Sequence, residues 1–217
     1  MKLKMMIGSV ALLGVVLAAC STAPNASVAA AEKATSKKID RGEFQDAVRK
    51  LWEDHVTWTR LYIVSAAAGL PDAQLTAERL LRNQDDIGNA VKPFYGEEAG
   101  AKLTALLRTH ILQAADLLTA AKAGDTAEVG AVKTAWYENG DEIAAFLSSA
   151  NPTNWPLEAV QHHMRMHLDL TLDEAVKRLE GNYAADIALY DEVHDAILQM
   201  ADIISAGIQA QFPERFN

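Results

Sequence analysis

The sequence predicts an all-α protein whose folded part is a six-helix bundle built from three tandem helical hairpins. Beyond residue 40, apolar residues recur with the helical period, and almost no run alternates as a strand would. An internal repeat supports the hairpins: three fifteen-residue segments each run from a histidine to a glycine. They are HVTWTRLYIVSAAAG (55–69), HILQAADLLTAAKAG (110–124) and HLDLTLDEAVKRLEG (167–181). Three segments in register, with matched apolar positions, indicate one repeated unit.

Each segment is expected to end the first helix of a hairpin, because a glycine just past a helix end can adopt the left-handed conformation that closes it. A second helix then follows a short polar stretch and carries a polar residue 13 to 15 positions after the glycine. These residues are Asn83, Asn139 and His194, and Pro93, Pro152 and Pro213 lie near the ends of the units. We therefore expect one domain over 41–217, with hairpins over about 41–96, 97–152 and 153–217.

The N-terminus has the layout of a secretory signal over residues 1–19, with Lys2 and Lys4 before an uncharged apolar run that is short for a membrane span. The run ends in Leu17-Ala18-Ala19-Cys20, which resembles the lipobox of bacterial lipoproteins. The resemblance implies that Cys20 becomes the lipid-bearing first residue of an extracytoplasmic protein anchored to the bacterial cell membrane or outer membrane. The alternative is an ordinary signal with an incidental cysteine. Residues 20–40 are small and polar, which predicts a flexible tether.

Composition limits the functions that remain. Cys20 is the only cysteine, which excludes an internal disulfide, a CxxC redox pair and a zinc-thiolate site. Loss of Lys2 and Lys4 with the signal takes the formal net charge from −9 to −11, which argues against nucleic-acid binding. The membrane is then a partner only through the lipid on Cys20. The chain has no Gly-rich phosphate loop and no GxSxG nucleophile, so the sequence predicts no catalytic residue.

The repeat histidines are expected to face the core. The positions seven, four and three residues before each of them lie on the same helix face, and all are apolar except His163. The second helices place Asn83, Asn139 and His194 on apolar stripes in the same way. A buried polar group without a partner costs about 1–3 kcal/mol, so we expect these six side chains to meet inside the bundle.

These histidines predict a transition-metal site. His163 and His167 have the i, i+4 spacing that lets two imidazoles on one helix bind one ion, and imidazole suits copper, zinc and iron. The predicted ligands are His55, His110, His163, His167 and His194, with Asn83, Asp86, Asn139, Glu142 and Met164 around them. The role would be storage, delivery or sensing. The alternative is a structural or partner-binding lipoprotein whose hydrogen-bonded polar core holds no metal.

The folded part also resembles bacterial secreted helical proteins, on the segments WEDHVTWTR and HMRMHLDLTLDEAV. The resemblance implies no activity. An enzyme stays a third interpretation, because a histidine-bound metal with an open coordination position can be catalytic. Neither a nucleophile nor a substrate pocket can be named from the sequence.

Overall fold

The computed structural model describes residues 38–217, which form an all-α fold as predicted. The helices of this part are α1 (Arg41–Ala68), α2 (Ala73–Ala123), α3 (Thr126–Ala150), α4 (Leu157–Leu179) and α5 (Tyr183–Gln211), followed by the 3₁₀ turn η1 (Pro213–Arg215). The signal, Cys20 and all but the end of the predicted tether lie outside the described residues. The last tether residues already belong to the fold, because Ile39 pairs with Phe216 beside the C-terminus.

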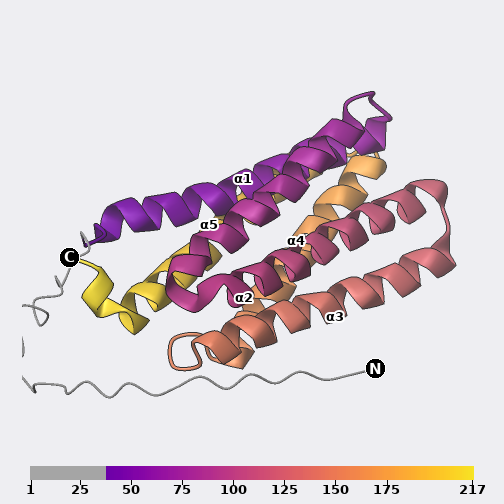
Figure 1. Ribbon diagram of the computed structural model, residues 1–217. Helices are drawn as coiled ribbons and strands as arrows, with labels where there is room; N and C mark the ends of the chain where they lie inside the picture. Colours follow the sequence, from indigo (N-terminus) through magenta and orange to yellow (C-terminus); the bar gives the residue numbers. More distant parts are fainter. Residues whose placement is uncertain (1–37) are drawn as a thin grey trace, which may run out of the picture. The chain divides into compact units, whose positions relative to one another are not determined.

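The described part has five α-helices where six were predicted, and the difference lies in α2. This element covers 51 residues and joins the second and third predicted helices, with Pro93 inside it. Gly96 has φ 88° and ψ 169°, which is not a helical conformation. A glycine tolerates this positive φ, and the chain reverses there. Figure 1 shows α2 running down to this point and returning, so that the element has two arms.

The two arms of α2 lie unusually close together. A Cβ atom built on Gly88 would lie 2.7 Å from the carbonyl oxygen of Gly100, and one built on Gly100 would lie 2.7 Å from that of Gly88. Further along, Thr104 Oγ1 is 3.5 Å from the Gln84 carbonyl, and Arg108 donates to the Leu81 carbonyl at 3.1 Å. Only glycine at both positions allows the backbones to approach this closely.

The predicted helix ends at the repeat glycines are confirmed. Gly69, Gly124 and Gly181 have φ values of 66°, 72° and 75°. The backbone N–H of Gly124 donates to the Ala121 carbonyl, and the next residue's N–H donates to Ala120, so the last turn's carbonyls are satisfied. Each of the three glycines thus closes a helix of the fold, and Gly96 supplies a fourth reversal.

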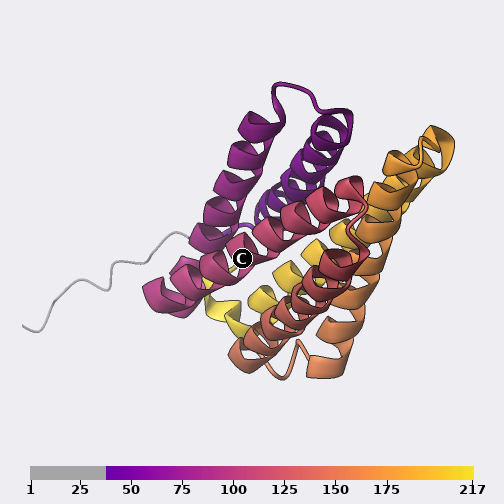
Figure 2. The same cartoon turned by 90° about the vertical axis from the view of Figure 1, so that its right-hand side faces the viewer.

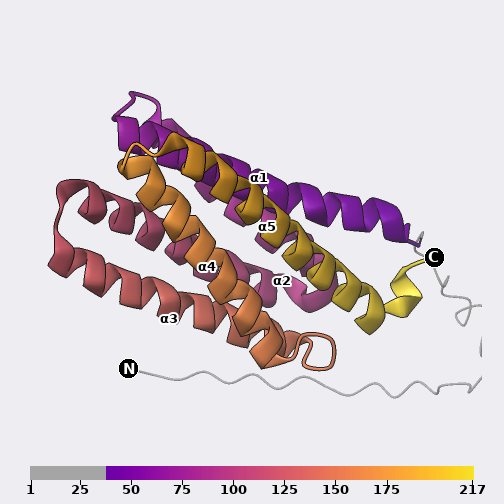
Figure 3. The ribbon, with the colours of Figure 1, turned by 180° about the vertical axis from the view of Figure 1, so that it is seen from behind.

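The helices form a closed ring of neighbours. In chain order each helix packs on the next, and α5 returns to α1. Figures 1 and 3 show the C-terminus beside the beginning of α1, and Figure 2 shows α1 with the first arm of α2, and α4 with α5, as adjacent antiparallel pairs. A bidentate ion pair between Arg49 and Asp202, with N–O distances of 2.6 Å, joins α1 to α5. No helix of the described part is sufficiently long and apolar to span a membrane.

The core is apolar at both ends of the bundle and polar in the middle. Near the termini, an aromatic cluster packs edge to face or stacked, with ring centroids 5.1 to 5.7 Å apart, between Phe44, Phe94, Phe212 and Phe216. Near the repeat glycines, aliphatic side chains such as Leu80, Ile111 and Leu117 are buried. The repeat histidines lie midway along α1, the second arm of α2 and α4. They therefore occupy a layer between the two apolar regions.

Substitution of Gly88 by alanine should destabilise the protein. The added methyl group would meet the Gly100 backbone, which cannot rotate away as a side chain can, and overpacking of this kind costs about 1–3 kcal/mol. Urea unfolding of the residue 38–217 domain in the full chain measures the change. Gly130→Ala in α3 is the matched control, because its Cβ would meet nothing within 4 Å. It should be neutral or stabilising by about 0.5–1 kcal/mol. Equal effects of the two variants would contradict the close approach.

Candidate functional site: a buried polar layer

The middle of the core holds three imidazole rings from three helices. His55 of α1, His110 of α2 and His167 of α4 are 2%, 3% and 6% exposed. The ring of His167 lies between the other two, with ring centroids 5.8 Å from His55 and 6.5 Å from His110. The helical stripes and the repeat thus bring these predicted site residues together. We call these three rings the histidine layer.

The His55 ring contacts Gln84, a polar residue of the first arm of α2. Gln84 Nε2 lies 3.3 Å from His55 Nδ1 and also donates to the Leu80 carbonyl at 2.8 Å. The same amide nitrogen lies 3.2 Å from Asn83 Oδ1, so its two hydrogens are shared among three acceptors. Asn83 lies beside Gln84 and donates from Nδ2 to the Leu51 carbonyl at 3.0 Å. Gln84 was not predicted as a site residue.

The His110 ring is also paired with an amide side chain. Its Nδ1 lies 3.0 Å from Asn139 Oδ1, while Asn139 Nδ2 donates to the Leu106 carbonyl at 3.3 Å. The amide oxygen accepts, so His110 carries its proton on Nδ1 and a lone pair on Nε2. Trp136 stacks on the ring at a centroid distance of 5.2 Å.

Burial keeps the histidine layer neutral. It lowers the pKa of His55 to about 4 and, together with the charge of a protonated His55, the pKa of His110 to about 3. The pKa of His167 lies well below its usual value for the same reasons, burial first and then the two neighbouring rings. The three imidazoles are uncharged at neutral pH and act as hydrogen-bonding groups.

The other predicted site residues do not join the histidine layer. His194 lies near the surface, with Nε2 3.3 Å from Glu53 Oε1, and its side chain is 30% exposed. The prediction that it faces inward is wrong, since the ring turns towards α1 instead of the core. His163 is partly buried beside His162, with ring centroids 5.7 Å apart. Met164, Asn83 and Asn139 are buried as expected, whereas Asp86 and Glu142 are exposed.

The predicted metal ligands therefore do not converge. Within residues 38–217, no group of three or more His, Cys, Asp or Glu residues is arranged to hold a metal ion. The hydrogen bonds explain part of this result, because the amides of Gln84 and Asn139 already occupy Nδ1 of His55 and of His110. The five-histidine shell is not present in this arrangement of side chains.

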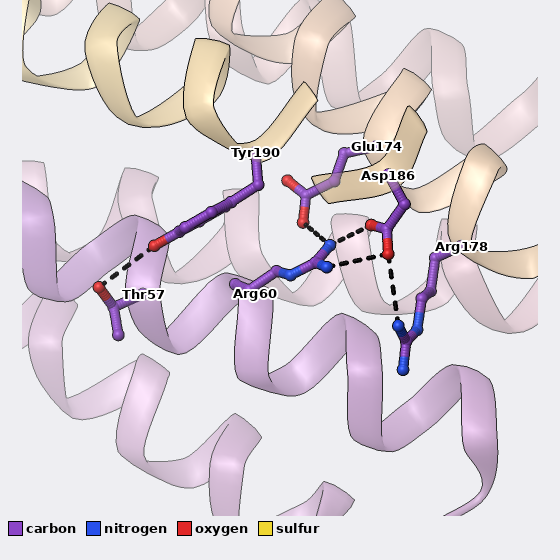
Figure 4. Close-up of polar contacts among 6 residues, drawn as sticks. All are labelled: Thr57, Arg60, Glu174, Arg178, Asp186 and Tyr190. Atoms are coloured by element: carbon purple, nitrogen blue, oxygen red, sulfur yellow. Dashed lines mark hydrogen bonds and ion pairs between the residues drawn. The ribbon is translucent and has the colours of Figure 1, made fainter. Parts of the chain in front are cut away.

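A second polar cluster, which includes Glu174 seven residues after His167 in α4, was not predicted from the sequence. Arg60 of α1 bonds to both oxygens of Asp186, one of them at 2.9 Å, and to Glu174 Oε1 at 2.8 Å. Arg178 reaches Asp186 Oδ2 at 3.3 Å, as Figure 4 shows. The Tyr190 ring lies under the Arg60 guanidinium at 5.5 Å. We call Arg60, Glu174, Arg178 and Asp186 the ion cluster.

The carboxylates of the ion cluster differ in their protonation. Burial raises the pKa of Glu174 to about 7, although Arg60 opposes the shift. The pKa of Asp186 is lowered, because its hydrogen bonds and charge pairing with Arg60 and Arg178 outweigh the effect of burial. The side chains of Glu174 and Asp186 are 1% and 0% exposed, so neither has solvent as an alternative partner.

One signal could have revealed the ion cluster. Glu174 is seven residues after His167 and lies on the same stripe of its helix, and Asp186 is eight residues before His194. A carboxylate on a core-facing stripe requires a buried cation. The segments around Glu174 and Asp186 do not show which arginine supplies this cation, since Arg60 lies more than a hundred residues away in the chain.

Comparison of the chain with protein-family models, with curated proteins and with solved structures finds no match. The site is therefore interpreted from its own geometry.

Glu174→Gln should change the pH dependence of stability. The folded protein holds the Glu174 proton up to about pH 7, whereas the unfolded chain releases it near pH 4.5. Between these values folding takes up a proton, so the Glu174 contribution to stability falls as pH rises. The glutamine variant lacks this loss and should gain roughly 3 kcal/mol relative to wild type between pH 5 and pH 8. Urea unfolding across this range measures the difference. Glu180→Gln, at an exposed pair with Lys177, is the control and should stay parallel to wild type.

Proposed function

We propose that this protein is an extracytoplasmic, lipid-anchored helical protein with a structural or partner-binding role. Its histidine layer fixes how the helices pack. The observation that carries the proposal is a repeated hydrogen bond: Asn83 donates to the Leu51 carbonyl, and Asn139 donates to the Leu106 carbonyl. Each acceptor lies four residues before the repeat histidine of its hairpin, so the same asparagine bond joins the two helices of both hairpins.

The repeated bond also supports three hairpins as the building units of the domain. The reversal of α2 at Gly96 coincides with the proposed boundary between the first two units. In the third unit His194 takes the place of the asparagine and pairs with Glu53 of α1 instead. On this basis we propose that the domain is a bundle of six helices, in which the two arms of α2 count as separate helices.

The anchor rests on the N-terminal signal. Cys20→Ser should release the protein from the membrane or block its processing, because a serine cannot carry the thioether-linked lipid. Fractionation of cells expressing either form, with intact mass of the product, measures this outcome. Wild-type behaviour of the serine variant, in both membrane association and mature mass, would contradict a lipid on Cys20.

Transition-metal binding is the second candidate function. It is favoured by the neutral imidazoles of the histidine layer and by His167 Nδ1, which is buried with no hydrogen-bond partner among residues 38–217. The ligands would be His55, His110 and His167, and the Gln84 amide would have to leave His55 Nδ1. Copper, zinc and iron suit such a set.

His167→Leu separates the two functions. For a structural layer, leucine removes a buried polar group whose Nδ1 has no partner, so thermal stability should be similar to wild type or higher, with no effect of EDTA on either protein. For a metal site, wild type alone should gain stability from added metal, about 2.7 kcal/mol at a hundredfold excess over the dissociation constant. Thermal melts of the untagged protein with and without EDTA measure this. The exposed His162 provides the control variant, His162→Leu. An EDTA-sensitive wild type beside an insensitive His167→Leu would overturn the structural role.

A further inference from the structure

A cavity of about 50 Å³ lies on the side of the histidine layer nearer the repeat glycines. It is lined by residues of α1, both arms of α2, α3 and α4, it is partly open to solvent, and eleven of its fifteen lining residues are aliphatic. The aliphatic walls include Leu80, Leu117 and Val176. Trp136, which stacks on His110, separates the cavity from the histidine layer.

Two polar side chains line this apolar cavity without partners. Trp136 Nε1 and Thr171 Oγ1 are both buried, and neither has a hydrogen-bond partner within residues 38–217. The remaining lining threonine, Thr59, already donates to the His55 carbonyl at 2.8 Å. An unpaired buried donor or hydroxyl is unfavourable, so both groups require a partner from outside the chain.

Bound water is a poor partner at this position. An ordered internal water makes about three hydrogen bonds, and the aliphatic walls offer few polar atoms for the second and third. A molecule that places one oxygen atom near Trp136 and Thr171 and an apolar body against the aliphatic walls satisfies both parts of the cavity.

We propose that the cavity binds a small neutral molecule with an unbranched aliphatic chain and an oxygen acceptor at its end, such as a ketone or an alcohol. The indole N–H of Trp136 only donates, which selects an acceptor. None of the fifteen described residues that line the cavity is charged, so a charged head group would be buried without a counter-ion.

The outer part of the cavity supports a neutral ligand. Tyr62 of α1 is half-buried at the lining, and its pKa is raised by burial and by the charge of Asp116. Asp116 is exposed, so a carboxylate lies near the outer end and disfavours anionic molecules. Because the cavity is partly open and lining residues such as Tyr62 are only half-buried, the end of a ligand that exceeds about 50 Å³ can extend out of it.

Titration of the full mature protein with 2-hexanone tests the proposal. The indole N–H signal of Trp136, assigned with Trp136→Phe, should shift saturably in two-dimensional NMR spectra, and the melting temperature should rise. Thr171→Val keeps the shape of the side chain and removes the hydroxyl, and should weaken binding by about fivefold. Thr134→Val, at an exposed hydroxyl that bonds to the Gly130 carbonyl, should leave affinity unchanged.

Ala175→Phe adds a ring at a lining position and should abolish the shift, and Ala114→Leu serves the same purpose if the first variant does not fold. Hexylammonium, with the same chain and a charged head, should not bind. Absence of a saturable Trp136 shift in wild type would overturn the proposal. So would binding that survives in a folded cavity-filling variant, binding of hexylammonium equal to that of 2-hexanone, or unchanged affinity in Thr171→Val.

Discussion

The histidine layer depends on hydrogen-bonding partners that neighbouring helices supply to two of its three buried rings. Burial removes water and charge together, because a protonated imidazole in this core would lie close to two others. The partners are amides, which stay neutral at every pH: Gln84 for His55 and Asn139 for His110. Each amide also donates to a backbone carbonyl. Gln84 donates to Leu80 of its own helix, and Asn139 of α3 donates to Leu106 of α2. The relative positions of α1, α2 and α3 depend on these paired contacts.

Buried polar side chains also line one face of α4. His167, Thr171 and Glu174 follow each other at spacings of four and three residues and are all buried. They lie at three different levels: the histidine layer, the cavity and the ion cluster. The polar groups of α4 are thus placed in a line through an apolar core. Glu174 pairs with Arg60, whereas His167 Nδ1 and the hydroxyl of Thr171 have no hydrogen-bond partner among residues 38–217.

The sequence predicted those parts of the fold and site that follow from period and repeat. Helical periodicity gave the all-α class, the repeat glycines gave the helix ends, and the apolar stripes placed His55, His110 and His167 in the core. The prediction for His194 was wrong because its stripe borders the surface, where Glu53 of another helix offers a charged partner. Gln84 and Arg60 were missed because their partners come from other helices, and one-dimensional spacing does not show which helix faces which.

The histidine layer and Glu174 act on stability in opposite directions as pH changes. The histidine layer favours the folded state above pH 6.5, where unfolded histidine is neutral, and this contribution is lost as pH falls towards the lowered pKa values of about 4 and 3. Glu174 contributes most below pH 4.5, and its contribution is lost as pH rises to about 7. Between pH 4.5 and 6.5 the two effects oppose each other. Asp186, whose pKa is lowered by its pairing with Arg60 and Arg178, adds to the histidine layer in making the fold sensitive to acid. Above pH 6.5 the unfolded histidines are already neutral, whereas the contribution of Glu174 continues to change as pH rises to about 7.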